Sequence, residues 1–335
     1  MAKKLSGEDF RADVGHLHFL WMYTSIAASK WSRVHDAPLL ITPNGMLERW
    51  ALNNSKVKKK IAYALFERKN LKSAACIQAN TVKEVEDLRL LGLANSLCVI
   101  PNGVEIPPDS FFSEQQGAPR DDKEVVRLVF LGRIHPKKGL LHLISGLDLW
   151  KRRERRNGIE LQLVIAGFSE VNHLEELEKL ASALNSSYKH VEEDSWGVDS
   201  SAYEVLFHGP VYREEKARLL NTADLFVLPS LSEGQPMAIL DAMAHRLPVM
   251  MTRECNLDDV FDKAGGIEIK PNAKSISEGI QTFVEMSIDD RAKIGDWGLS
   301  LVRANYSWES IAKQLEEVYF WMAGNGPRPD SLSGI

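Results

Sequence analysis

The stretch "PSLSEGQPMAILDAMA", Pro229 to Ala244, decides which fold this sequence predicts. It follows one short apolar run, "ADLFVLP" (223–229), and precedes another, "LPVMM" (247–251). Short apolar runs bounded by turn residues predict buried strands, and the longer segment between them predicts a helix. The turn "LSEGQ" therefore joins the end of a strand to the start of a helix. Open parallel sheets bind ligands beyond the carboxyl ends of their strands, so this turn is the first candidate for a binding site.

The same alternation continues along the chain. Strands are expected at 13–19, 37–43, 73–79 and 96–102, and then at 127–132, 161–167, 205–209, 223–229, 247–252 and 266–270. This pattern predicts an α/β fold with parallel sheets and helices on both faces. The polar stretch 109–124 is the expected boundary between two Rossmann-like, doubly wound domains, 1–112 and 125–307. The first domain has few strands and is incomplete: either it is small, or the front of a larger domain is missing.

The composition limits the class of protein. The chain has 335 residues, of which 44% are hydrophobic and 26% charged, the balance of a globular protein. A net charge of −5 argues against a nucleic-acid partner. Cys76, Cys98 and Cys255 are widely spaced, form no metal-binding pattern and suit a reducing cytoplasm. The sequence has no secretion signal and no apolar run of membrane-spanning length, so we expect a cytoplasmic location.

The turn "LSEGQ" carries the first candidate residues. Pro236 is expected at the first helical position, and Gly234 lets the backbone approach a ligand closely. Backbone N–H groups at a helix start bind anions. Glu233, just before the helix, either complements the helix dipole or accepts hydrogen bonds from sugar hydroxyls. Asp241 either binds ribose hydroxyls or is an ordinary acid on the helix surface.

Three further loops follow predicted strands. In "FLGRIHPKKGL" (130–140), Arg133, Lys137 and Lys138 suit a phosphate group, although a solvated basic loop explains them as well. "HLHFLW" (16–21) contains His18, and "ITPNGML" (41–47) contains Asn44. A single histidine after a strand is more often structural than catalytic, and "PNG" is typical of a turn.

Taken together, these motifs resemble a known family. "FLGRIHPKKGL", "LVIAG", "ADLFVLPSLSEGQPMAILDAMA" and "LPVMMT" are similar, as a set and in this order, to the retaining glycosyltransferases of family 4, which have the GT-B fold. "CVIPNGVEIP" and "HLHFLW" look like that family's linker and first domain. The resemblance covers nearly all of 12–320 and is greatest to enzymes of bacterial surface polysaccharide synthesis. It implies two domains facing a cleft, with a C-terminal helix, 308–324, crossing back to the first domain.

The resemblance also implies residue roles. The family's E-x7-E motif falls on Glu233, for the donor sugar, and Asp241, for the ribose. Arg133 and Lys138 would stabilise the leaving diphosphate, so the expected catalytic residues are Glu233, Arg133 and Lys138. The backbone from Gly234 to Met237, through Gln235 and Pro236, would cradle the diphosphate, while His18 and Asn44 would lie on the acceptor side. The donor would be a nucleotide-diphosphate sugar and the acceptor a glycan or a lipid-linked glycan, with no metal or other cofactor.

The sequence departs from the family pattern at three places. Asp241 stands where the family has its second Glu, and Asn44 stands where a His is common. The family's Gly-rich loop near the N-terminus is absent. These departures keep a second hypothesis open: a catalytically impaired GT-B protein that binds nucleotides or acts as a scaffold. A dinucleotide oxidoreductase has little support, because neither half has a G-x-G-x-x-G after its first strand.

A basic segment, 56–72, is not explained by these motifs. "KVKKKIAYALFERKNLK" combines lysines with apolar residues at helical spacing. Such a helix either lies on an anionic membrane surface, which would place the protein at the inner face of the membrane, or is a solvated helix face.

Overall fold

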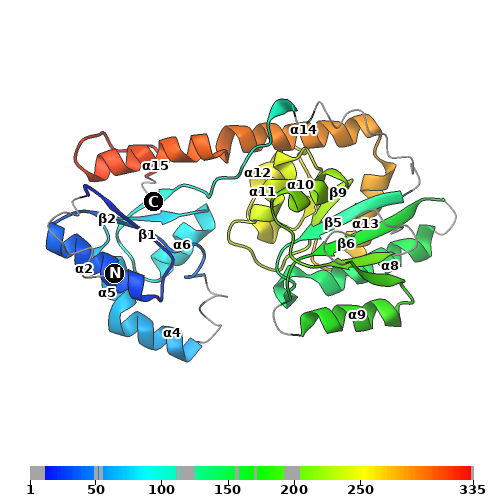
Figure 1. Ribbon diagram of the computed structural model, residues 1–335, viewed down its shortest axis with the longest axis horizontal. Coiled ribbons are helices and arrows are strands. Elements are labelled where there is room, and N and C mark those ends of the chain that lie inside the picture. Colours follow the sequence, from blue (N-terminus) through cyan, green and yellow to red (C-terminus); the bar gives the residue numbers. More distant parts are fainter. Residues whose placement is uncertain are drawn as a thin grey trace. The chain divides into compact units, whose positions relative to one another are not determined.

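The computed structural model describes residues 12–48, 52, 56–110, 112, 125–154, 158–169, 172–191 and 204–332. Most of the predicted boundary segment, 113–124, lies outside this set. The chain forms two compact units. Unit 1 contains residues 1–103 and 308–335, and unit 2 contains residues 104–307. The predicted α/β class is confirmed, since each unit is built on a sheet of parallel strands (Figure 1).

Unit 1 contains a four-stranded parallel sheet in the order β1-β2-β3-β4. The strands are β1 (Gly15–His18), β2 (Leu39–Thr42), β3 (Cys76–Ala79) and β4 (Ser96–Val99), one in each of the four predicted segments. The helices are α2 (Tyr23–His35), α4 (Lys56–Ala62), the π-helix η1 (Tyr63–Glu67), α5 (Arg68–Ser73), α6 (Val82–Leu90) and α15 (Trp308–Met322).

The two faces of this sheet belong to two different hydrophobic clusters. Leu39 and Ile41 pack in one cluster, together with residues of the helices that connect the strands. Leu40, between them, points to the opposite face, because side chains alternate along a strand. There it packs in a cluster with Ile311 and Val318 of α15. The last helix of the chain is therefore part of unit 1. Cys76 and Cys98 are buried in the same cluster, as small core residues.

A chain of polar side chains links α15 to three strands of the sheet. His16 Nδ1 lies 2.6 Å from the Tyr319 hydroxyl, and His16 Nε2 lies 2.7 Å from Thr42 Oγ1. Thr42 donates to Gln78 Oε1 (2.8 Å), and Gln78 donates to the Ile100 carbonyl (2.7 Å). Because the Thr42 hydrogen is used on Gln78, the network assigns the proton of His16 to Nε2 and makes Nδ1 the acceptor from Tyr319. Burial, with the neighbouring His18, lowers the pKa of His16 to about 3, which keeps this ring neutral.

Unit 2 contains a seven-stranded parallel sheet in the order β11-β10-β9-β5-β6-β8-β7. The strands are β5 (Val125–Leu131), β6 (Glu160–Ala166), β7 (Tyr188–Val191), β8 (Val205–His208), β9 (Leu225–Leu228), β10 (Val249–Met251) and β11 (Ile267–Glu268). Six were predicted. The prediction missed β7, because "YKHV" is a half-exposed edge strand with polar residues at its centre.

The helical segments of unit 2 surround this sheet. They are η2 (Pro136–Lys138), α8 (Leu140–Glu154), α9 (His173–Ala183), α10 (Arg213–Asn221), α11 (Met237–Ala244), η3 (Arg253–Cys255), α12 (Asp258–Asp262), α13 (Ala273–Glu285) and α14 (Ile288–Asn305). From β5 the chain passes to β6 on one side, and it later returns through β9 to the other side of β5. The order of strands therefore reverses between β5 and β9, and this is the switch point where such sheets bind ligands.

Gly139 allows the chain to turn at this point. Its φ of +70° lies in the left-handed region, and a Cβ there would lie 2.1 Å from the carbonyl oxygen of Pro229. A residue with a side chain would push apart the loops that follow β5 and β9.

Replacing this glycine tests the close approach. We expect Gly139→Ala to lower the free energy of unfolding of unit 2 by about 2 to 4 kcal/mol, from left-handed strain and the clash with Pro229. Gly158→Ala is the matched control, because its φ is +69° but no described atom lies within 4 Å of the place that a Cβ would take. In urea unfolding, Gly158→Ala should lower the free energy of unfolding by about 1 kcal/mol. Equal losses in the two variants would contradict the close packing of the two loops.

A second test uses His16, the partly buried histidine of unit 1. The folded state holds His16 neutral down to a pKa of about 3, whereas the unfolded chain takes up the proton near pH 6.5. The contribution of His16 to the free energy of unfolding is therefore fully present above pH 6.5. It falls by about 1.4 kcal/mol per pH unit as the pH drops from 6.5 toward 3. His16→Gln keeps a donor toward Thr42 but cannot titrate. Urea unfolding between pH 7 and 4 should therefore show that the free energy of unfolding falls less steeply with pH in the variant than in wild type. Equal slopes in the two proteins would contradict a neutral His16 in the folded state.

Candidate active site

The loops after β5 and β9 meet at the switch point of unit 2. β5 and β9 are hydrogen-bonded neighbours, with Leu128 opposite Leu225. Beyond the strands, the Leu231 N–H donates to the Lys137 carbonyl oxygen at 2.7 Å. The two sequence motifs that were singled out separately, one around Lys138 and one around Glu233, are therefore parts of one site.

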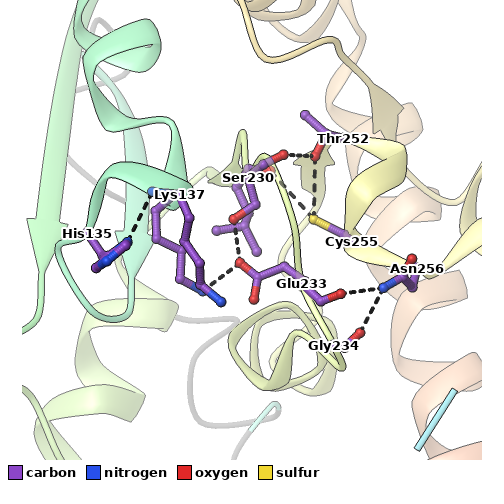
Figure 2. Close-up of polar contacts among 10 residues, drawn as sticks. His135, Lys137, Ser230, Glu233, Gly234, Thr252, Cys255 and Asn256 are labelled. Atoms are coloured by element: carbon purple, nitrogen blue, oxygen red, sulfur yellow. Dashed lines mark hydrogen bonds and ion pairs between the residues drawn. The ribbon is translucent and has the colours of Figure 1, made fainter. Parts of the chain in front are cut away.

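An ion pair lies at the centre of this site. Lys138 Nζ is 2.6 Å from Glu233 Oε1, and the Ser230 hydroxyl donates to the same oxygen. Figure 2 shows Glu233 turned toward Ser230 and toward the basic loop after β5. Glu233 is only 5% exposed. The predicted contact of Glu233 with hydroxyls of the donor sugar stays a prediction, and in this structure a lysine and a serine hold one of its two carboxylate oxygens.

The backbone on either side of Glu233 is also fixed. The Asn256 side-chain amide donates to the carbonyl oxygens of Glu233 and Gly234, as Figure 2 shows. The Glu233 N–H donates to the Glu254 carbonyl at 2.9 Å. The Thr252 hydroxyl, which follows β10, donates to the Ser230 carbonyl at 2.7 Å. The carboxylate is thus positioned by the ends of three adjacent strands.

Cys255 lies beside this site but does not suit a nucleophile. Burial raises its pKa to about 12, and the nearby Glu233 carboxylate acts in the same direction. The thiol is therefore neutral near pH 7 and contacts Thr252 Oγ1 and the Leu228 carbonyl.

The helix start differs from the prediction by one residue. Pro236 is the N-cap residue, with φ −83° and ψ 81°, and α11 begins at Met237. Pro236 has no N–H group. The Met237 N–H already donates to the Gln235 carbonyl at 3.1 Å. Of the predicted cradle from Gly234 to Met237, the first two residues are therefore the better candidates for donating to an anion.

The remaining predicted donor-site residues lie near this centre in sequence but make other contacts. Asp241, in α11, forms an ion pair with Lys216 of α10, at 3.0 Å. Its carbonyl accepts from His245 Nδ1 at 2.8 Å. Arg133 is exposed at the start of the loop after β5. The structure brings Lys138 and Glu233 into direct contact, whereas Asp241 has a different cation as its partner.

Unit 1 holds the other two predicted residues. His18 is exposed at the carboxyl end of β1. Asn44 has a left-handed backbone, φ +53°, and its side chain donates to the Thr42 carbonyl and accepts from Asn80. Buried Glu84 connects this turn to the next loop by accepting from the N–H groups of Gly45 and Asn80.

The sequence interpretation missed several residues that organise these sites. Lys216, Ser230, Asn256 and Asn80 carry no motif that separates them from ordinary surface residues. Glu84 does have a signal, since "TVKE" (81–84) is a helix capping box, and Thr81 indeed accepts from the Glu84 N–H. Among the described residues, no group of three or more His, Cys, Asp or Glu side chains is arranged to hold a metal ion.

Comparison with known proteins places both units in glycosyltransferase families. Residues 125–286 match the family "Glycosyl transferases group 1", and residues 1–103 match "Glycosyl transferase 4-like domain". The two matches together cover most of the chain.

Individual relatives agree with these matches. "Uncharacterized glycosyltransferase MJ1607" of Methanocaldococcus jannaschii is 29% identical over 60% of this chain, and the match spans 45% of that protein. "Putative teichuronic acid biosynthesis glycosyltransferase TuaC" of Bacillus subtilis is 25% identical, over 95% of this chain and 72% of TuaC. "D-inositol 3-phosphate glycosyltransferase" of Arthrobacter sp. is 28% identical, over 92% of this chain and 70% of the relative.

Solved structures share the fold. HepE of Anabaena, in complex with UDP and glucose, has a TM-score of 0.68 at 17% identity, covering 95% of this chain and 80% of HepE. Sucrose-phosphate synthase from Thermosynechococcus elongatus has a TM-score of 0.70 at 20% identity, covering 96% of this chain and 76% of the synthase. At these identities the likeness concerns the fold.

The ion pair at the centre of the site can be tested through stability. We expect Lys138→Met to lower the free energy of unfolding of unit 2 by about 3 kcal/mol, because Glu233 would remain buried without its cation. Glu268→Gln is the control. It breaks the 2.8 Å pair with Arg253, in which both side chains are largely exposed, and should cost less than about 1 kcal/mol. Similar losses in urea unfolding would mean that the Lys138–Glu233 pair is no more important than a surface pair.

Proposed function

This chain belongs to the GT-B glycosyltransferases, and we propose on that premise that it moves a sugar from a nucleotide-diphosphate sugar to an acceptor hydroxyl. We further propose that the sugar keeps its anomeric configuration. The observation that carries the proposal is the contact of Lys138 with Glu233 at the switch point of unit 2. Both donor-binding motifs of the sequence contribute to that one contact.

Lys138 is suited to the diphosphate of the donor. An ammonium group has three N–H donors, and Glu233 accepts one of them. The other two would bind phosphate oxygens, so the lysine can bind the carboxylate and the diphosphate together. Glu233 thereby positions Lys138, and its second oxygen, Oε2, is the proposed acceptor for a hydroxyl of the donor sugar.

The same residues account for catalysis. The leaving diphosphate gains negative charge as the bond to the sugar breaks, and the sugar becomes oxocarbenium-like. Lys138, exposed Arg133 and the backbone N–H groups of Gly234 and Gln235 would stabilise that charge from fixed positions, which is the effective form of electrostatic catalysis. The acceptor hydroxyl attacks from the face that the diphosphate leaves, and its proton passes to the departing phosphate oxygen. We propose that these protein groups perform this role without a metal ion.

Asp241 is the proposed ribose contact. Its pairing with Lys216 uses Oδ1, at 3.0 Å, and we propose that a ribose hydroxyl binds the other carboxylate oxygen, Oδ2. UDP is the nucleotide in the HepE structure, and uridine is therefore the first base to test.

The proposed acceptor rests on one relative. The name of TuaC associates that relative with teichuronic acid biosynthesis. We therefore propose a glycan or a lipid-linked glycan of a bacterial surface polysaccharide as the acceptor. His18 and Asn44, at the carboxyl ends of β1 and β2, are the proposed acceptor-side residues.

One observation favours the alternative, a protein that binds the nucleotide sugar without turning it over. The Asn44 amide bonds both to the Thr42 carbonyl and to Asn80, so it serves the turn and cannot carry a proton near pH 7. This alternative retains the donor site and loses only the transfer step.

Calorimetric titration with UDP, GDP and ADP, each alone and as its sugar conjugate, tests the donor site. We expect one nucleotide to bind, and Glu233→Gln to weaken the nucleotide sugar at least about tenfold because it loses the charge that positions Lys138. Glu268→Gln, at the exposed pair with Arg253, should bind as wild type. If no nucleotide binds, or if both variants bind normally, the donor site is assigned wrongly.

Turnover separates the two functions. With the bound donor and glycan acceptors, NMR should show a product of the same anomeric configuration, and EDTA should not change the rate. Binding without transfer to any acceptor would favour the alternative, and an inverted product would contradict the proposed mechanism.

A further inference from the structure

The helical run from α4 through η1 to α5 carries a line of exposed apolar side chains. Val57 is 71% exposed, Ile61 54% and Leu65 75%. The residues are four positions apart, so they lie along one side of the helix. Single exposed apolar residues are common, but three in a row on one helix face mark a contact surface.

The opposite side of this run is already packed within unit 1. Glu67, Asn70 and Leu71 are buried, and the Tyr63 ring lies 6.5 Å from the ring of Trp21, measured between centroids. The orientation of the helix is therefore fixed by its own core contacts. The exposed apolar line is a second face, which the described residues of unit 1 leave uncovered.

The exposed face is also strongly basic. Lys58, Lys60 and Lys69 are exposed. Residues 56–73 include seven Lys or Arg and a single acid, Glu67, which is buried. The whole chain carries a net charge of −5, so this segment is a local basic region on an acidic protein.

We propose that this surface, the basic apolar face formed by Val57, Ile61, Leu65 and the exposed lysines around them, binds an anionic lipid bilayer. The helix would lie along the bilayer surface, with the three aliphatic side chains at the boundary of the acyl chains. The lysine stems would extend past them, and the ammonium groups would contact lipid phosphates. No helix among the described residues is long and apolar enough to cross a bilayer. The proposed contact is with the bilayer surface.

The mixture of side chains favours a lipid surface over a protein partner. The cores of protein interfaces are depleted in lysine, whereas interfacial helices combine lysine with aliphatic residues. Lipid headgroups also need no fixed geometry, which suits flexible lysines. The proposal does not depend on the transfer reaction, because lipid binding by this face requires no nucleotide sugar.

Vesicle flotation of the full chain tests the apolar part of the face. With vesicles of phosphatidylcholine and phosphatidylglycerol, we expect Ile61→Ser combined with Leu65→Ser to weaken binding at least about tenfold. Leu90→Ser combined with Ile288→Ser is the matched control, because Leu90 is 66% and Ile288 81% exposed on other helices. Circular dichroism spectra equal to wild type for both double variants would show that these exposed positions do not affect folding.

The basic part of the face is tested in the same assay. Lys58→Gln, Lys60→Gln and Lys69→Gln in one chain should weaken binding by about fivefold for each lysine removed. Wild type should bind vesicles of phosphatidylcholine alone at least about tenfold more weakly. Raising the salt from about 0.1 M to about 0.5 M should weaken binding to the anionic vesicles.

A triple variant of equal charge change controls for net charge. Lys179→Gln, Lys274→Gln and Lys313→Gln remove three exposed lysines from α9, α13 and α15 and should bind as wild type. Equal losses in the two triple variants would overturn the proposal, as would equal binding to neutral and anionic vesicles. If sedimentation instead shows a dimer that only the Ile61 and Leu65 double variant dissociates, the occupant is a second copy of the chain and the lipid proposal is wrong.

Discussion

The buried contact between Lys138 and Glu233 is the interaction on which the functional part of the structure depends. Two opposite charges that are nearly removed from water are stable only with good geometry and further hydrogen bonds. Ser230 and the fixed backbone around Glu233 supply that geometry. The loops after β5, β9 and β10 must therefore keep their relative positions. The left-handed Gly139, pressed against Pro229, meets the same requirement through the backbone.

Unit 1 solves a similar problem with neutral groups. Its chain of hydrogen bonds passes from Tyr319 through His16, Thr42 and Gln78 to a backbone carbonyl, with one donor and one acceptor at each step. A protonated His16 would disrupt this order, which agrees with the strong lowering of its pKa by burial. These hydrogen bonds also connect α15 to the strands of the sheet. Unit 1 thus uses polar side chains on its strands to hold its last helix, whereas unit 2 uses polar side chains in the loops beyond its strands to hold a charged site.

The two proposals concern separate surfaces. The proposed donor site lies in unit 2 at a point where the sheet order reverses, and a ligand there would meet fixed charges. The basic apolar face lies on helices of unit 1, where flexible lysines surround exposed aliphatic side chains. A preorganised site suits a small charged ligand, whereas an adaptable surface suits lipids. If both proposals hold, one unit binds the soluble donor and the other brings the protein to the bilayer.

The sequence by itself determined the α/β class, ten of the eleven strands of the described chain and the two loops that form the candidate site, because hydrophobic periodicity and turn residues are local signals. It missed β7, whose polar edge pattern resembles a loop, and it placed the start of α11 one residue early. Only the tertiary structure decided that Glu233 is buried against Lys138 and that Asp241 pairs with Lys216. It also decided that Val57, Ile61 and Leu65 face outward. Each of these facts depends on which distant segments pack together. A local sequence pattern does not specify the distant segment against which it packs.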